Sequence, residues 1–184
     1  MRKKIFRRFL TRLFLGCFCF SLLPWLAEYQ KNKYEKNEFF FSSPLITESK
    51  TLSFRRDQNG KGYFGASRNG GRIHQGIDLA VPVENPVLAA KSGRVVFAGE
   101  EKGYGNTIDI LHPDGLLSRY AHLSAFNIVE GEWVTQNQMI GRSGKTGNAA
   151  NPKIMPHLHF EIRYRGQALD PTNHLLDPSI TLHS

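Results

Sequence analysis

Two short segments combine imidazole and carboxylate side chains at spacings that suit a metal ion. His74 and Asp78 lie four residues apart at the start of an apolar run, and His157 and His159 lie two residues apart. In an extended chain, side chains at even spacing lie on the same face. Zinc favours His nitrogen and carboxylate oxygen in four-coordinate sites, and catalytic sites leave one position for water. His74, Asp78 and His159 therefore predict a zinc (Zn2+) site with an open position.

Two other interpretations of these three residues are weaker. A structural zinc site would need a fourth protein ligand, commonly cysteine, but Cys17 and Cys19 both lie in the N-terminal apolar segment. The three side chains could also be hydrogen-bonded polar groups of a strand with no metal. The presence of three such residues beside a second histidine favours the metal. With two neutral ligands and one anion, the ion could acidify water and polarise a carbonyl group.

Two histidines are candidates for catalysis rather than for metal binding. His122 ends an alternating strand, and His157 precedes the predicted ligand His159 by two residues. Peptide hydrolysis at a metal needs groups that accept a proton from water, stabilise the tetrahedral intermediate and protonate the leaving amine. Imidazoles that titrate near the working pH can share these tasks. We therefore predict catalytic roles for His122 and His157; for His122 a satisfied surface histidine is the alternative.

The elements that position these residues are predicted to be β-strands. From about residue 52, short β-branched or alternating runs are separated by Gly, Pro, Asn and Asp, which is typical of an all-β sandwich or barrel. The expected strands are 87–90, 94–98, 107–111, 116–122 and 158–164. In the last strand Leu158, Phe160 and Ile162 occupy the face opposite to the histidines, so one face packs in the core and the other carries the chemistry.

Other functions suggested by short motifs are not supported. The glycine-rich segments 60–71 and 141–147 lack the order of a P-loop, and we expect them to line a groove for an extended peptide. The phrases 90–96 and 130–141 also occur in lipoyl- and biotin-carrier barrels. A carrier would need a lysine at a hairpin tip, whereas Lys145 lies in a glycine-rich loop. His112 is expected in a hairpin turn.

The positive charge of the chain is concentrated at its N-terminus. The net charge is +8, but residues 1–36 hold nine Lys/Arg and two acids, which leaves 15 Lys/Arg and 14 acids, or +1, for the remainder. A basic surface that would release counterions from a phosphate backbone is therefore not expected, and we predict no nucleic-acid partner.

The N-terminal segment predicts export. Six cations precede the uncharged stretch 13–27, whose fifteen residues fall short of the roughly 20 needed to span a bilayer. No A-x-A-like cleavage site follows, so a signal peptide and a retained membrane anchor both stay open for 1–27. Lipidation of Cys17 is not expected, because Arg12 shortens the apolar stretch before it. We expect a linker at 28–51, a metallopeptidase domain at 52–174 and a C-terminal tail at 175–184, in a monomer at the periplasm or the outer face of the cytoplasmic membrane.

Read together from residue 62 to 172, the motifs resemble those of the lysostaphin-type, or LytM-like, metallopeptidases. The phrases are Phe64-Gly65 with Arg68, His74-x-Gly76-x-Asp78, Ala89-Ala90 through Gly93, Tyr104-Gly105-Asn106, Tyr120-Ala121-His122-Leu123-Ser124, Gly144-x-Thr146-Gly147 and Pro156-His157-Leu158-His159-Phe160-Glu161. The resemblance implies a two-sheet antiparallel β-fold of the duplicated hybrid motif type, with a groove. It also implies zinc at His74, Asp78 and His159, catalysis by His122 and His157, and cleavage of peptidoglycan peptides.

The chain departs from the family pattern in one loop. Residues 148–155 lengthen the segment before His157, and Met155 takes the place of a glycine. This difference bears on substrate preference, and the bond that is cut stays open. The side-chain oxygens of Asn59 and Asn69 could occupy the open zinc position in a latent form, in which the site is occluded. A non-catalytic adaptor of the same fold, which binds wall or regulates another hydrolase, is the second hypothesis; the complete set of five site residues favours the enzyme.

Overall fold

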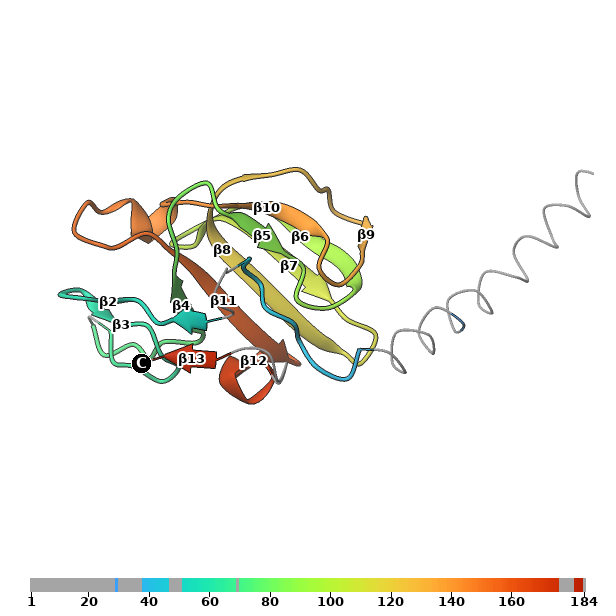
Figure 1. The fold of residues 1–184 in the computed structure, drawn as a ribbon, viewed down its shortest axis with the longest axis horizontal. Coiled ribbons are helices and arrows are strands. Elements are labelled where there is room, and N and C mark those ends of the chain that lie inside the picture. The colour runs from blue at the N-terminus through green and yellow to red at the C-terminus, as the bar shows by residue number, and fades with distance from the viewer. Residues whose placement is uncertain (1–28, 30–37, 47–50, 69, 176–180, 184) are drawn as a thin grey trace, which may run out of the picture. The chain divides into compact units, whose positions relative to one another are not determined.

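The computed structural model describes residues 29, 38–46, 51–68, 70–175 and 181–183 (Figure 1). The chain divides into two units, Met1–Asn37 and Glu38–Ser184, and all but one of the described residues belong to the second. The predicted export segment 1–27 and Cys17 lie outside the described residues. Among the described residues, no helix is both long enough and apolar enough to cross a membrane.

The second unit is built on one branched antiparallel sheet, so the predicted all-β class is confirmed. Its long strands are β6 (Gly93–Glu101), β7 (Gly105–Leu111), β8 (Leu116–Phe126) and β11 (His157–Tyr164). The shorter strands are β4 (Ile77–Ala80), β5 (Pro86–Leu88), β9 (Trp133–Val134), β10 (Met139–Ser143) and β12 (Gln167–Leu169). The order is β12-β11-β8-β7-β6-β9, with β4 paired to β11 and β10 paired to both β5 and β8. The sheet therefore branches at β8.

Both branches contribute side chains to one hydrophobic core. Val87 of β5 and Ile140 of β10 are fully buried in the same cluster as Ile110 of β7. On β11, Leu158 and Phe160 alternate with the histidines and are also fully buried, as the sequence predicts. Burial of each such side chain contributes about 1.5–3 kcal/mol relative to exposure. The core thus holds the apolar face of β11 in place, and the histidine face is turned toward a groove.

Residues 38–46, within the predicted linker, pack against the domain. The Phe41 and Leu45 side chains are 2% and 3% exposed. The Ser42 N–H donates to the Ala90 carbonyl oxygen at 2.8 Å, and the Leu88 N–H donates to the Pro44 carbonyl oxygen at 2.9 Å. These contacts make 38–46 part of the folded unit rather than a tether beside it, because an exposed Phe41 would forgo its hydrophobic burial.

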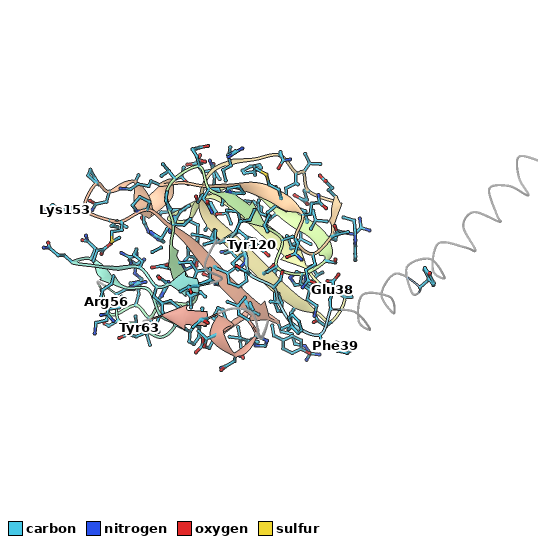
Figure 2. The ribbon with its side chains drawn as sticks, viewed as in Figure 1. Glu38, Phe39, Arg56, Tyr63, Tyr120 and Lys153 are labelled. Atoms are coloured by element: carbon cyan, nitrogen blue, oxygen red, sulfur yellow. The ribbon has the colours of Figure 1, made fainter. Side chains whose placement is uncertain are left out.

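Residues of the predicted C-terminal tail also contact the domain. Strand β13 (Thr181–His183) pairs in parallel with β1 (Thr51–Ser53), and Leu175 is 6% exposed in the core. The remaining elements are the hairpin of β2 (Arg56–Asp57) and β3 (Gly60–Lys61) and the 3-10 turns η1 (Gly147–Ala150) and η2 (Pro171–Asn173). Figure 2 shows Arg56, Tyr63 and Lys153 at one end of this unit and Glu38 and Phe39 at the other.

Candidate metal centre and groove

The pairing of β4 with β11 brings the two predicted metal-binding segments together. His159 lies opposite Asp78 in the register, and His74 lies in the loop just before β4. Gly76 allows this loop to approach β11, because a Cβ there would collide with the Phe160 carbonyl oxygen and lie 3.1 Å from Cε1 of His159. Glycine is therefore required between His74 and Asp78 by close packing of the backbone.

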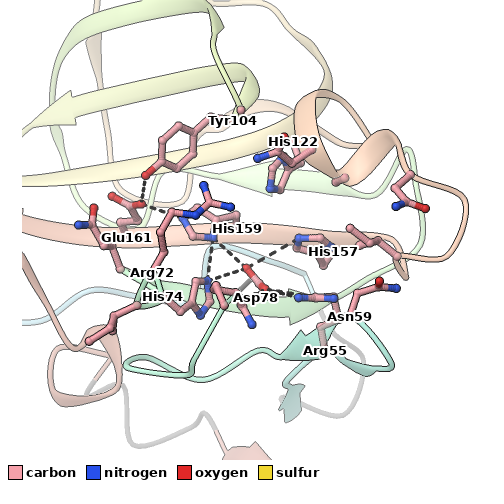
Figure 3. A pocket seen from close by; sticks show the side chains of 18 of the residues that line it. Arg55, Asn59, Arg72, His74, Asp78, Tyr104, His122, His157, His159 and Glu161 are labelled. Carbon is pink, nitrogen blue, oxygen red and sulfur yellow. Dashed lines mark hydrogen bonds and ion pairs between the residues drawn. The ribbon is translucent and has the colours of Figure 1, made fainter. Parts of the chain in front are cut away.

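Three polar atoms converge at this point: Nε2 of His74, Oδ1 of Asp78 and Nδ1 of His159 (Figure 3). His159 Nδ1 lies 2.8 Å from Asp78 Oδ1 and 3.1 Å from His74 Nε2. The His74 and Asp78 atoms are 3.0 Å apart. Two zinc bonds of about 2.1 Å at a tetrahedral angle separate their donor atoms by about 3.4 Å. The three buried side chains therefore fit a shared metal ion after small outward shifts.

The second polar atom of each of these side chains is held by the protein. His74 Nδ1–H donates to the Tyr63 carbonyl oxygen at 2.9 Å. His159 Nε2–H donates to Oε1 of Glu161 at 2.8 Å. Asp78 Oδ2 accepts hydrogen bonds from two guanidinium groups, those of Arg55 and Arg68. Such outer contacts orient metal ligands and select the nitrogen that faces the ion.

Charges around His159 favour a cation at the convergence point. Burial lowers the pKa of His159, but hydrogen bonds to Asp78 and Glu161 outweigh burial and raise the pKa to about 9. Burial raises the pKa of Asp78, and hydrogen bonds from His159 and His74 outweigh it and lower the pKa well below its ordinary value. Positive charge between these groups, as a proton or a metal cation, is therefore stabilised.

Glu161 is the residue behind His159. It is fully buried, accepts the Tyr104 hydroxyl on Oε1 at 2.8 Å and accepts Nε–H of Arg163 on Oε2 at 2.5 Å. Burial raises its pKa, but the contacts with His159 and Arg163 outweigh burial and lower the pKa to about 2. Glu161 therefore stays ionised and holds the imidazole of His159 in one orientation.

The predicted catalytic histidines face the same groove. The rings of His122 and His157 are 4.9 Å apart in an edge arrangement, and His122 is 5.8 Å from the His159 ring. His122 Nδ1–H donates to the Thr146 carbonyl oxygen at 3.0 Å, and His157 Nδ1–H donates to that of Met155 at 2.7 Å. In each ring Nε2 is therefore the atom able to accept a proton.

Burial keeps both imidazoles neutral. Burial, followed by the neighbouring histidines His159 and His157, lowers the pKa of His122 to about 3. Burial likewise lowers the pKa of His157 to about 4, against the opposing effect of Asp78. A neutral imidazole at working pH is the form that can act as a base.

A β-bulge aims His122 into the groove. The register between β7 and β8 shifts between Asn106 and Ile108, so Ala121 and His122 together oppose one residue of β7. His122 has φ of +63°, in the left-handed region that few non-glycine residues adopt, and its N–H donates to the Tyr104 carbonyl oxygen at 2.9 Å. Bulges re-aim a side chain, and strained backbone concentrates at functional sites.

Comparison with known proteins identifies the family. Residues 72–171 match the model described as Peptidase family M23. The chain belongs to peptidase family M23. The match includes all five residues that the sequence predicts for the site, and the predicted family resemblance is confirmed.

Relatives of this M23 chain carry different descriptions. The chain is 43% identical over 102 residues to the DD-carboxypeptidase/endopeptidase Mpg of Neisseria meningitidis, which covers 55% of this chain and 23% of that protein. It is 41% identical over 113 residues to the murein hydrolase activator NlpD of Escherichia coli, covering 61% of this chain and 28% of that one. The chain thus spans about a quarter of the length of these curated relatives.

Solved M23 structures share the fold. The catalytic domain of lysostaphin from Staphylococcus simulans superimposes with a TM-score of 0.55 at 35% identity, over 66% of this chain and 92% of that one. A zinc-containing peptidase from Vibrio cholerae superimposes with a TM-score of 0.58 at 27% identity, over 72% of this chain and 39% of that one.

The groove of this M23 chain has a volume of about 670 Å³ and contains all five predicted site residues. Of the two glycine-rich segments expected to line it, 60–71 contributes Arg68, but no residue of 141–147 is among the lining residues. Residues just after that segment, between Asn148 and Ile154, line the groove instead. Asn59 also lines the groove, but its side-chain amide donates to the Lys153 carbonyl oxygen at 2.8 Å. Asn69 lies outside the described residues, and the latent form stays a hypothesis.

Several side chains of the site received no role from the sequence, among them Arg55, Arg68, Tyr104 and Glu161. Glu161 lies two residues after His159, and the period of two along a strand places it on the same face. Tyr104 and Glu161 belong to phrases of the family resemblance, although no role followed from it. Arg55 has no comparable signal, because it is 23 residues from its partner Asp78 and only the fold brings them together.

Proposed function

We propose that this M23 chain is an exported zinc metalloendopeptidase that hydrolyses peptide bonds of peptidoglycan. The observation that carries the proposal is the convergence of three buried donor atoms, each with its outer atom held by the protein, beside two neutral imidazoles. His74, Asp78 and His159 would hold the ion. When bound, zinc supplies a Lewis acid that polarises the scissile carbonyl group and acidifies water.

The two remaining histidines would move the protons. Nδ1 of each ring donates to a backbone carbonyl, which leaves Nε2 of His122 and His157 as proton acceptors at the groove. One neutral imidazole accepts a proton from the attacking water, and an imidazolium then donates one to the leaving amine. The ring that has accepted this proton can also donate a hydrogen bond from Nε2 to the developing oxyanion. The low pKa of both residues keeps them in the neutral form that the first step needs, and it differs from the titration near the working pH expected from the sequence because both rings are buried.

The second candidate function is a non-catalytic adaptor that regulates another wall hydrolase. The relative NlpD, described as a murein hydrolase activator, supports it. The relative Mpg, described as a DD-carboxypeptidase/endopeptidase, supports the enzyme. Family membership does not separate these two functions, and the presence of all five predicted site residues supports the enzyme. One further relative is described as a lipoprotein, which supports export. Export would also bring the enzyme to its proposed substrate, which lies outside the cytoplasm.

Incubation of the zinc-loaded protein with purified peptidoglycan tests the proposal. Muropeptide analysis should show new amine ends, and these should disappear with His122→Ala but persist with Arg56→Gln, an exposed residue away from the groove lining. A protein that binds zinc, releases no amine ends and stimulates a separate wall amidase would instead be the adaptor. The mass of the mature N-terminus in membrane and soluble fractions tests whether 1–27 is removed.

A further inference from the structure

One groove wall is held by the β2–β3 hairpin. Asp57 Oδ2 accepts the Met155 N–H at 2.9 Å, and Asn59 donates to the Lys153 carbonyl oxygen at 2.8 Å. Ile154, which lies between Lys153 and Met155 in the sequence, lines the groove. This wall belongs to the segment 148–155, where the sequence departs from the family pattern. The hairpin therefore holds the part of the groove that is particular to this chain.

The same hairpin is tied to the metal-binding carboxylate through Arg55. Its guanidinium donates to Asp78 Oδ2 from Nε at 3.1 Å and from Nη2 at 3.0 Å. Its third nitrogen, Nη1, donates to Asp57 Oδ2 at 2.7 Å. Arg55 is 4% exposed, so both ion pairs are shielded from water. One planar cation thus connects a carboxylate of the site to a carboxylate of the wall.

We propose that Arg55 is a positioning residue that couples the metal-binding carboxylate of Asp78 to the groove wall at Met155 through Asp57. It holds Oδ2 of Asp78 so that Oδ1 faces the convergence point. It also holds Asp57 so that the hydrogen bond from the Met155 N–H stays formed, and we call the wall closed when this bond is present. The inference rests on the proposed function in one respect, because it takes Asp78 as a zinc ligand. Zinc binding and wall closure should then stabilise each other.

Linkage makes this coupling quantitative. If zinc stabilises the closed wall by some factor, a closed wall raises zinc affinity by the same factor. The Met155 amide reports wall closure, because its hydrogen bond to Asp57 must open before the amide exchanges with solvent. Two separate measurements, the effect of zinc on this exchange rate and the effect of an uncoupled wall on zinc affinity, should therefore agree.

Two variants break the connection without removing the metal-binding residues. Asp57→Asn keeps the shape of the side chain but removes the charge that pairs with Arg55. Arg55→Lys keeps a positive charge beside Asp78, but an ammonium group cannot bridge the two carboxylates in a fixed plane. Arg56→Gln, a change at the neighbouring exposed residue, is the matched control.

Zinc affinity should be measured by chelator competition, and Met155 exchange by hydrogen–deuterium exchange, on the full chain in detergent with and without zinc. We expect both variants to bind zinc about tenfold more weakly than the control, and zinc to slow Met155 exchange in the control but not in the variants. If the wild type binds one zinc but Met155 exchange is independent of it, or both variants keep wild-type affinity, the coupling is overturned. A wild type that binds no zinc overturns the proposed metal site as well, and the zinc stoichiometry separates the two failures.

Discussion

His112 and the groove histidines occupy two regions that burial does not distinguish. His112 is 3% exposed, and His74, His122, His157 and His159 are between 3% and 8% exposed. His112 lies at the turn between β7 and β8, as predicted, where it packs edge-on against Phe41 at 5.1 Å. A list of buried histidines would therefore place all five in one class.

The hydrogen bonds separate the two regions. His112 Nδ1–H donates to the Ser92 carbonyl oxygen at 2.9 Å, and its Nε2 accepts from the Ser118 hydroxyl at 2.8 Å, so both nitrogens are used by the protein. His122 and His157 each have one nitrogen fixed by a backbone carbonyl, and the other is directed to the groove. A buried histidine with one nitrogen fixed and the other directed to a groove is thus a candidate for proton transfer. At His74 and His159 the second nitrogen instead faces Asp78 at the convergence point, as expected of proposed metal ligands.

Removal of a proposed metal ligand should have the largest effect on the groove. We expect His159→Ala to abolish stoichiometric zinc binding and to lower the rate of hydrolysis about 10³-fold or more. The ion stabilises the transition state by several kcal/mol, and each loss of about 1.36 kcal/mol slows the reaction tenfold. Zinc content by mass spectrometry and turnover of a muropeptide substrate check this. Retained hydrolysis in a zinc-free variant would mean that the convergence point is not the catalytic centre.

Replacement of either proposed proton-transfer histidine should separate catalysis from metal binding. We expect His122→Ala and His157→Ala each to lower kcat/KM about 10²-fold or more while one zinc per chain is kept. Steady-state kinetics and zinc stoichiometry on the same samples check this. Equal losses of zinc and activity would show that these residues hold the ion instead.

Replacement of His112 should lower the stability of the protein without affecting its activity. We expect His112→Gln to lower the free energy of unfolding by about 1–3 kcal/mol, because it leaves buried partners unsatisfied, while zinc affinity and kcat/KM of the folded protein stay unchanged. Urea unfolding beside the kinetic assay measures both quantities. A large fall in kcat/KM at unchanged stability would remove the distinction between the two regions.

The pH dependence of stability should sharpen the comparison further. Burial lowers the pKa of His112 from 6.5 to about 4, so the folded state binds fewer protons than the unfolded state between these values. The stabilisation is complete above pH 6.5 and is lost as the pH falls toward 4. Between pH 7 and 5.5 we expect the wild type to lose about 1 kcal/mol more than His112→Gln. Urea unfolding at both pH values checks this, and equal losses would contradict it.

The strands were predictable to different degrees. Leu158, Phe160 and Ile162 alternate with polar residues over a full strand, and the structure buries all three. Residues 38–46 lie in the longer segment 28–50, which is rich in Lys, Asn and Glu, and a local pattern of that kind predicts a linker. Their place in the domain depends on Phe41 and Leu45 reaching a core made by residues far along the chain. Packing of this kind has no short-range signal.

The sequence predicted the five candidate site residues from their types and spacing, and the period of two explains why His157 and His159 share a face. The order of the motifs along the chain indicated the family, which the comparison confirms. The tertiary structure alone decided how these residues are supported. The bulge that turns His122 into the groove and the Arg55 bridge from Asp78 to Asp57 both depend on contacts between different segments of the chain. Hydrogen-bond geometry across such distances is set by the fold as a whole, and no local pattern of residues encodes it.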